Sequence, residues 1–425
     1  MLRRPFWLAG LLLALATGCS SDDDNGGGGD TPSKLGRTVL VYMAAQNSLG
    51  SSGNQKSDST EIMKGRQYVG SNDCLLLFID DAANPRIYRV TATSATPTLV
   101  KTWSEDGNST SPDFLCEVLT WVKDSFPSDE YGLVMWSHAD GWLPSTNKNY
   151  SSSSATAPKM RPYSFGIDDG SRMGTDTGTQ MDVDDMATAI AESGMYPKYI
   201  FFDACLMQNL EVVYDLKDVT DYVVASPIAT PAAGANYTHQ LQSGLFAEDP
   251  SDIAATYASD VSDSGQAADY SDFGIVISAV RTDKVRAVAD ALSQALPYST
   301  LVGKQSPDMT GVLKYQAYSY YFYYRPHNYD AAESIRQILP EDYQADVLAA
   351  LDEAVVYKAA TSQFWIGPGY WTFEEVDTDT YSGISLFVPQ QVYTDNASIC
   401  EHGDHNANFQ NTAWYEAAGW AQTGW

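Results

Sequence analysis

Tyr131-Gly-Leu-Val-Met-Trp136 and Tyr199-Ile-Phe-Phe-Asp203 are the two stretches that decide the fold. Both are continuous apolar runs, and Thr38-Val-Leu-Val-Tyr-Met43 and Cys74-Leu-Leu-Leu-Phe-Ile79 have the same character. A run without polar alternation is typical of a strand that is buried on both faces of a sheet. We therefore expect these four runs to form the centre of a parallel sheet.

Helix-like segments separate and follow these runs. Their apolar residues recur at helical spacing over 113–126, 182–193, 206–216, 253–263, 281–296 and 345–361. Further strands are expected at 222–225, 273–280 and 382–388, and an edge hairpin over 86–90 and 98–103. The alternation predicts an α/β fold with a mostly parallel sheet and right-handed crossovers. Residues 143–178 are rich in Ser, Thr, Asn, Gly and Asp, and are expected to form a long exposed loop.

The composition limits the class of protein. The chain has 425 residues, of which 44% are hydrophobic and 19% are charged. This excludes a disordered polyelectrolyte and is sufficient for one large domain with appendages or for two domains. The formal net charge of −29 repels phosphate backbones, so we expect no nucleic-acid partner.

The first residues have the character of a targeting segment. Arg3 and Arg4 give a positive start, and the apolar run over 6–16 is too short for a permanent membrane helix. Ala16-Thr17-Gly18-Cys19 then resembles a bacterial lipobox. This resemblance implies that residues 1–18 are a signal peptide and that lipid on Cys19 anchors the protein to a membrane. An ordinary secretory signal that happens to contain a cysteine is the alternative.

Residues 19–36 are rich in Ser, Asp and Gly and cannot build a core, so we expect a flexible tether. The acidic run in this tether resembles the sorting signal of surface-exposed lipoproteins in some Gram-negative bacteria. The resemblance implies a lipid-anchored protein of the bacterial cell envelope, on the outer membrane and exposed at the surface. Residues 37–425 then form the folded part, with a core over about 37–300 and a C-terminal extension over about 301–425.

His138 and Cys205 carry the strongest signal for chemistry. Each follows directly after one of the two strands quoted first. Because the carboxyl ends of parallel strands lie along one edge of a sheet, the two residues can face each other across one cleft. Cys205 also precedes the predicted helix over 206–216, whose N-terminus would favour a thiolate. His138 would take the thiol proton and later protonate a leaving amine, and the backbone N–H groups of Ala139 and Cys205 could bind an oxyanion.

The remaining cysteines and histidines give weaker signals. Cys74 and Cys116 are interpreted as small buried hydrophobic residues, and a disulfide that involves Cys400 stays open. The cysteines lack metal-ligand spacing, and we expect no metal site. A metal bound by His402 and His405 is the weaker interpretation of that pair.

Several segments together resemble the clostripain family of cysteine peptidases. The matching segments are Thr38-Val-Leu-Val-Tyr-Met-Ala-Ala-Gln-Asn47, Tyr131–Trp136, Ser137-His138-x-x-Gly141-Trp142, Asp203-Ala-Cys-Leu-Met207 with Glu211-Val-Val-Tyr214, and Ser382-Gly-Ile-Ser-Leu-Phe-Val-Pro389. The resemblance implies a caspase-like three-layer α/β/α sandwich with C-terminal additions. It also implies endopeptidase activity on proteins or peptides through a dyad of His138 and Cys205.

The same resemblance implies a substrate pocket and sets limits on cofactors. Asp203 falls at the base of the S1 pocket, which receives the side chain before the cleaved bond (P1), where family members commonly hold Arg or Lys. A structural role for Asp203 as a cap of the following helix is the alternative. We expect that the protein requires no cofactor, with calcium as a possible ligand. Some relatives need calcium, for which the acidic stretch over 168–185 offers oxygen ligands without EF-hand spacing.

The chain departs from the family pattern at two positions. Ala139 replaces the Gly that usually follows the catalytic His, and we expect activity to survive this change. Ala233 replaces an acid near the S1 entrance, which leaves the preference for a basic P1 residue open. Several relatives cut themselves in the loop between His and Cys, which here spans 143–166 and contains Lys148, Lys159 and Arg161.

Two other functions remain as alternatives. A catalytically inactive homologue that binds partners at the cell surface is suggested by the changes at Ala139 and Ala233. A glycan-handling lipoprotein is suggested by the anchor and the aromatic residues, but the sequence places no pair of carboxylates at glycosidase separation. The Tyr-rich segment over 318–325 is expected to pack between parts of the fold rather than to form a ligand platform.

Overall fold

The computed structural model describes residues 34–145, 164–170, 173–262, 274–320, 323–366, 373–398 and 402–425. Residues 34–425 form one compact unit. The expected signal peptide, Cys19, Cys400 and the three basic residues of the 143–166 loop lie outside the described residues. The side chains of the Tyr-rich segment lie outside them as well, so the interpretation of that segment stays a prediction.

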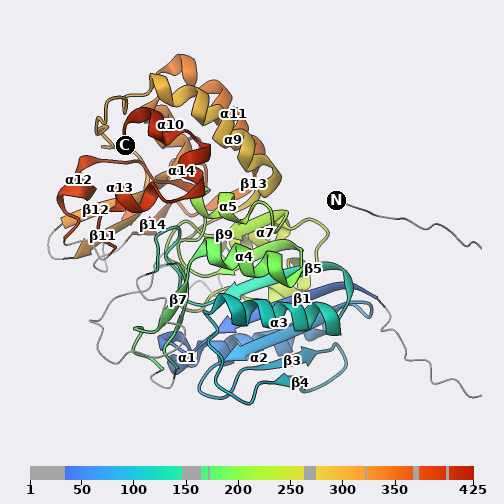
Figure 1. Ribbon diagram of the computed structural model, residues 1–425. Helices are drawn as coiled ribbons and strands as arrows, with labels where there is room; N and C mark the ends of the chain where they lie inside the picture. Colours follow the sequence, from blue (N-terminus) through green and yellow to red (C-terminus); the bar gives the residue numbers. More distant parts are fainter. Residues whose placement is uncertain are drawn as a thin grey trace, which may run out of the picture. The chain divides into compact units, whose positions relative to one another are not determined.

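A nine-stranded sheet forms the centre of this unit (Figure 1). Its order is β13 (Val355–Ala360), β10 (Val276–Arg281), β9 (Tyr222–Ala225), β8 (Pro197–Asp203), β5 (Ser128–Trp136), β1 (Leu35–Ala44), β2 (Cys74–Asp80), β3 (Arg86–Val90) and β4 (Thr98–Thr102). The strands from β9 to β2 pair in parallel, and the strands beyond them on both sides pair antiparallel. The predicted parallel centre and the predicted edge hairpin are both confirmed.

Helices cover both faces of the sheet, which makes the three-layer sandwich that the sequence predicts. One face packs against α2 (Asn54–Gly65), α6 (Tyr237–Ser243) and α7 (Ser251–Ser262). The other face packs against α3 (Pro112–Ser125), α4 (Val183–Ser193), α5 (Leu210–Leu216) and α9 (Thr282–Ala295), and Figure 1 shows α3 and α4 in front of the sheet. Within the described ranges, no helix combines the length and the apolar character needed to cross a membrane.

The C-terminal part closes onto the segment that follows β8. It contains a small sheet of β11 (Lys314–Tyr320), β12 (Tyr323–Asp330) and β16 (Ser385–Leu386), and a hairpin of β14 (Gln363–Trp365) and β15 (Phe373–Glu375). Its longer helices are α10 (Ala331–Ile338) and α11 (Ala345–Ala354). Its short helices are α12 (Gln391–Asp395), α13 (His405–Phe409) and α14 (Ala413–Ala417). Ser385 N donates to the Gln208 carbonyl at 2.9 Å, and Phe387 N donates to the Glu211 carboxylate at 2.9 Å. The extension is therefore part of the same core.

Two predicted helices are wrong in extent. The helix expected over 345–361 ends at Ala354, and residues 355–360 form β13, which pairs antiparallel with β10. Val355, Val356 and Tyr357 favour a strand, and pairing with a distant strand overrides the local helical pattern. The helix expected over 206–216 begins only at Leu210, because Leu206 has a positive φ of 63° that breaks a right-handed helix.

The loop expected over 143–178 is also partly wrong. Within its described residues, β6 (Phe165–Asp168) is fully buried and pairs antiparallel with β7 (Thr179–Met181). The first strand begins at Leu35, two residues inside the expected tether. Cys74 is buried as expected, whereas Cys116 is only partly buried.

Candidate active site

His138 and Cys205 follow neighbouring strands at equivalent positions. The register of β5 and β8 pairs Trp136 with Asp203, and each candidate residue comes two positions later. The loops after these strands also touch, because a Cβ added at Gly141 would lie 2.4 Å from Asn209 Oδ1 and 2.7 Å from the Leu206 carbonyl oxygen. The two residues therefore share one edge of the sheet, as the sequence predicts.

The His138 ring is held by a side chain that follows β1. Its Nε2 lies 2.9 Å from Ser48 Oγ, and 26% of the His138 side chain is exposed. The fully buried Asn47 positions this contact, because its Nδ2 donates to the Ala44 carbonyl at 2.8 Å and to Ser137 Oγ at 3.1 Å. Asn47 thus ties the loop after β1 to the loop after β5.

Asp176 adds a negative charge beside the same ring nitrogen. Its Oδ1 lies 3.9 Å from His138 Nε2 and accepts the Ser48 N–H at 2.7 Å. The buried Asp169 carboxylate fixes the turn that carries Asp176, since it accepts the backbone N–H groups of residues 174–177 at 2.8–3.0 Å. An acid held in this way stabilises a positive charge on the imidazole.

The Cys205 sulfur lies against Thr230, in the loop after β9. The Thr230 N–H donates to Sγ at 3.3 Å, and Thr230 Oγ1 lies 3.6 Å from it; among the described residues, all hydrogen-bonding contacts of the sulfur come from Thr230. Burial raises the pKa of the Cys205 thiol, and the contacts with Thr230 oppose this rise. Because α5 begins five positions later, the expected stabilisation of a thiolate by a helix N-terminus is wrong, and Thr230 supplies the nearest donor instead.

The backbone N–H groups of Ala139 and Cys205 are not used in the ladder around them. Ala139 and Phe165 form an isolated antiparallel β-bridge, and the residues beside them make its hydrogen bonds. Asp140 N donates to the Ser164 carbonyl, and Gly166 N donates to the His138 carbonyl. Among the described residues, neither Ala139 N nor Cys205 N has a hydrogen-bond acceptor. The Ala139 methyl packs within the hydrophobic core, so the side chain that replaces Gly is accommodated.

Asp203 is buried at the end of β8 with neutral partners. Its carboxylate accepts the Ala235 N–H at 3.1 Å and the Tyr237 hydroxyl at 2.9 Å. Burial raises the pKa of this carboxyl to about 6. The alternative role as a cap of the following helix is wrong, because that helix starts seven positions later. Ala233 is exposed, so the neutral side chain at the expected S1 entrance faces solvent.

The carboxylate and histidine groups that could bind a metal are different residues from His138 and Cys205. Among the described residues, Asp182, Asp184 and Asp185 bring three carboxylates within 4.8 Å of one another at the start of α4, where acids also complement the helix dipole. Carboxylate oxygens suit calcium. His402 and His405 approach only to a ring separation of 6.2 Å, and Nδ1 of His402 contacts the Pro144 carbonyl at 3.0 Å.

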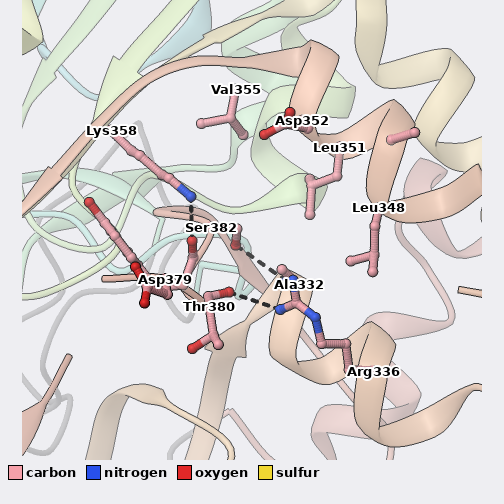
Figure 2. A pocket seen from close by; sticks show the side chains of 12 residues that line it. Ala332, Arg336, Leu348, Leu351, Asp352, Val355, Lys358, Asp379, Thr380 and Ser382 are labelled. Atoms are coloured by element: carbon pink, nitrogen blue, oxygen red, sulfur yellow. Dashed lines mark hydrogen bonds between the residues drawn. The ribbon is translucent and has the colours of Figure 1, made fainter. Parts of the chain in front are cut away.

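A cavity of about 330 Å³ lies apart from this edge, between α10, α11 and β13 (Figure 2). Its two cations are engaged by backbone, because Arg336 donates to the Thr380 carbonyl and Lys358 donates to the Tyr381 carbonyl. The cavity holds neither the candidate nucleophile nor a histidine, so it is separate from the candidate active site.

An α/β sandwich of caspase type with a histidine and a cysteine at one sheet edge defines the class of caspase-like cysteine peptidases. The sequence profile of the clostripain family matches residues 41–425, so the chain belongs to that family and is a cysteine-type endopeptidase. None of the curated proteins matches the chain.

Solved structures of C11 proteases also resemble this chain. A secreted C11 cysteine protease from Bacteroides thetaiotaomicron, in complex with an irreversible peptide inhibitor, is 25% identical, with a TM-score of 0.72 over 91% of this chain and 99% of that chain. An inactive zymogen C11 protease from Parabacteroides distasonis is 24% identical, with a TM-score of 0.70 over 91% and 99% of the two chains. Both likenesses extend through the C-terminal part of the fold.

Ser48, Asp176 and Thr230 were not expected from the sequence. Each lies on a loop and reaches the site only through contacts between distant segments. Ser48 follows the quoted run that ends at Asn47, and that position after a central strand is the single signal that could have indicated it.

Proposed function

We propose that the chain hydrolyses peptide bonds with Cys205 as nucleophile and His138 as general base and acid. His138 takes the thiol proton, and the thiolate attacks the carbonyl carbon of the substrate to form a tetrahedral oxyanion. The imidazolium then protonates the leaving amine, which leaves a thioester on Cys205. A water that gives its proton to His138 attacks the thioester and releases the second product.

The register of β5 and β8 is the observation that carries this proposal. Trp136 and Asp203 are paired at the ends of these adjacent parallel strands, and His138 and Cys205 each come two positions later, at the same edge of the sheet. The amide groups of Ala139 and Cys205, which have no acceptor among the described residues, supply the proposed oxyanion site. Asp176 supports the imidazolium that forms in each half of the reaction.

A basic P1 residue is proposed as the preferred substrate. Asp203 lies buried at the end of β8 and is met by neutral donors, so a guanidinium or ammonium group would be its first cationic partner in this part of the structure. A charge-assisted hydrogen bond to such a group contributes about 1.5–3 kcal/mol.

A peptide-library cleavage profile of the protein tests the proposal. His138→Ala and Cys205→Ala should each reduce turnover more than about 1000-fold. Both variants should unfold at the same temperature as the wild type. Undiminished hydrolysis by either variant contradicts the dyad, and a profile without Arg or Lys at P1 contradicts the proposed preference.

A catalytically inactive homologue remains the second candidate. It is favoured by the sulfur contacts, which are made with Thr230 rather than with the imidazole. A thiol-reactive peptide probe separates the two. Labelling of the wild type that is lost in Cys205→Ala supports the peptidase, whereas absence of labelling under reducing conditions supports the binding protein.

We further propose that lipid on Cys19 anchors the peptidase to the cell envelope, at the outer membrane and facing outward. The support is the sequence Ala16-Thr17-Gly18-Cys19 and the acidic tether after it. Metabolic labelling with an alkyne fatty acid should mark the wild type, and Cys19→Ala should remove the label and release the protein. Equal labelling of both proteins contradicts the anchor.

Calcium is proposed as a ligand of the cluster formed by Asp182, Asp184 and Asp185. These carboxylates fit the hard-oxygen preference of the ion, and Asp182 also accepts the Ser145 N–H. Calcium should raise the unfolding temperature of the wild type and leave that of Asp182→Asn unchanged. An equal shift in both proteins contradicts the site.

A further inference from the structure

Asp58, on α2, lies beside the proposed S1 pocket. Its side chain is buried, with 2% of its surface exposed, and it accepts the Trp136 Nε1–H at 2.7 Å. Trp136 is paired with Asp203 across β5 and β8, so both side chains point to the face of the sheet that α2, α6 and α7 cover. Asp58 therefore approaches the same strand ends as Asp203.

A third acid lies one helical turn further along α2. Glu61 accepts the Tyr237 N–H at 3.0 Å, and the hydroxyl of the same tyrosine donates to Asp203. Residues three positions apart share one face of a helix, so α2 directs Asp58 and Glu61 toward the side chains around Asp203. The three carboxylates thus come from two elements that meet at the strand ends.

The two buried acids have no cationic partner in the part of the chain that the structure describes. Among the described residues, no Lys, Arg or His forms an ion pair with Asp58 or Asp203. Burial, together with the charge of Asp203, raises the pKa of Asp58 to about 8. Buried carboxylates are costly unless they are protonated or paired, so this region is suited to receive a positive charge.

The backbone approaches Asp203 closely from the side of the Ala233 turn. A Cβ added at Gly234, which has a φ of +61°, would lie 2.8 Å from Asp203 Oδ2. The absence of a side chain at this position lets the backbone pack directly against the Asp203 carboxylate. Ala233 supplies no acid at the entrance, so a second negative charge in the pocket would come from another element.

We propose that Asp58 is the second acid of the S1 pocket, and that Asp58 and Asp203 together select a guanidinium side chain at P1. This inference rests on the proposed function, since it assumes that the pocket beside Asp203 receives the P1 side chain. A guanidinium carries five N–H donors in a planar fork and can engage two carboxylates at once, whereas citrulline has the same shape without the charge. Asp58 acts here as a specificity residue.

The test compares fluorogenic peptides that differ only in Arg or citrulline at P1. With the wild type, kcat/KM should be at least about 100-fold higher for Arg. Asp58→Asn, which keeps an acceptor for Trp136, should lower this ratio about tenfold, mainly through KM for the Arg peptide, and should leave the citrulline peptide unaffected. Asp252→Asn, which removes an exposed acid at the start of α7, is the matched control and should keep the wild-type ratio.

The outcomes separate this inference from the proposal on which it rests. A wild type that does not prefer Arg over citrulline contradicts the basic P1 preference and the role of Asp58 together. A wild-type preference that Asp58→Asn retains in full overturns the role of Asp58 alone. Where Asp58→Asn does not fold, Asp58→Glu shifts the charge by one methylene and should change the Arg-to-Lys ratio at least threefold; an unchanged ratio overturns the inference.

Discussion

Asp176 Oδ1 lies 3.9 Å from His138 Nε2, and it is held there by the Ser48 N–H at 2.7 Å. The carboxylate therefore faces the ring that becomes positively charged in the proposed reaction. We expect Asp176→Asn to lower kcat roughly 3- to 10-fold with little change in KM, because it removes a charge without removing the hydrogen-bond acceptor. Steady-state kinetics of the purified protein measure kcat and KM separately.

An exposed acid on another element provides the control for Asp176. Asp252 lies at the start of α7, so Asp252→Asn removes the same charge without touching the contact with His138. It should leave kcat unchanged. An equal loss in both variants means that the net charge of the protein, and not the contact with His138, sets the rate.

Thr230 is expected to tune the reactivity of Cys205. Its hydroxyl and its N–H both face the sulfur, and these contacts oppose the rise in the thiol pKa that burial causes. Thr230→Val keeps the N–H and removes the hydroxyl, so the pKa should rise further and alkylation by iodoacetamide should need a more alkaline pH. Thr230→Ser should retain the wild-type profile. Identical profiles for Val and Thr would show that the hydroxyl is irrelevant.

The strands and the site edge could be predicted because they depend on local pattern. The runs before His138 and Cys205 are continuous and apolar, and such runs become central parallel strands in almost any arrangement of helices. Once both strands are parallel, the position of the two residues at one edge follows. No knowledge of the loops is required for this step.

The elements that could not be predicted depend on distant contacts. Residues 355–360 become a strand because β10 pairs with them. The segment after Cys205 stays irregular because Leu206 N donates to the Ile228 carbonyl and Ser385 N donates to the Gln208 carbonyl. Sequence periodicity carries no information about such partners, and Thr230 and Asp176 were missed for the same reason.

The buried His405 should make stability fall at acid pH. Burial lowers the pKa of His405 to about 4, below its ordinary value of 6.5. The unfolded chain therefore binds a proton that the folded chain does not, and stability is lost as pH falls from 6.5 toward 4. Replacing His405 with Leu should reduce this loss by up to about 3 kcal/mol. Urea unfolding of both proteins at pH 7 and pH 4.5 measures the difference.

The His405 variant has to be compared with the wild type at each pH, because buried carboxyl groups change the folding stability in the opposite direction as the pH falls. Burial raises the pKa of Glu211 and of Asp215 to about 7, so acidification stabilises the folded chain through these groups. The difference between variant and wild type removes the contribution of the carboxyls. It reports His405 together with His402, whose pKa is lowered by burial and by the charge of His405. A difference that does not change with pH contradicts the assignment.

Restoring an acid at position 233 should strengthen the selection of a basic P1 residue. Ala233 is exposed in the turn that precedes Gly234, and the chain there packs against Asp203. A carboxylate at an exposed site is screened by solvent and salt, so Ala233→Asp should raise kcat/KM for an Arg peptide only about 2- to 5-fold. The gain should shrink when the ionic strength is raised, because the Debye length falls from about 10 Å at 0.1 M to about 3 Å at 1 M salt. Ala233→Asn provides the neutral control, and an equal gain with Asn would assign the effect to turn conformation instead of charge.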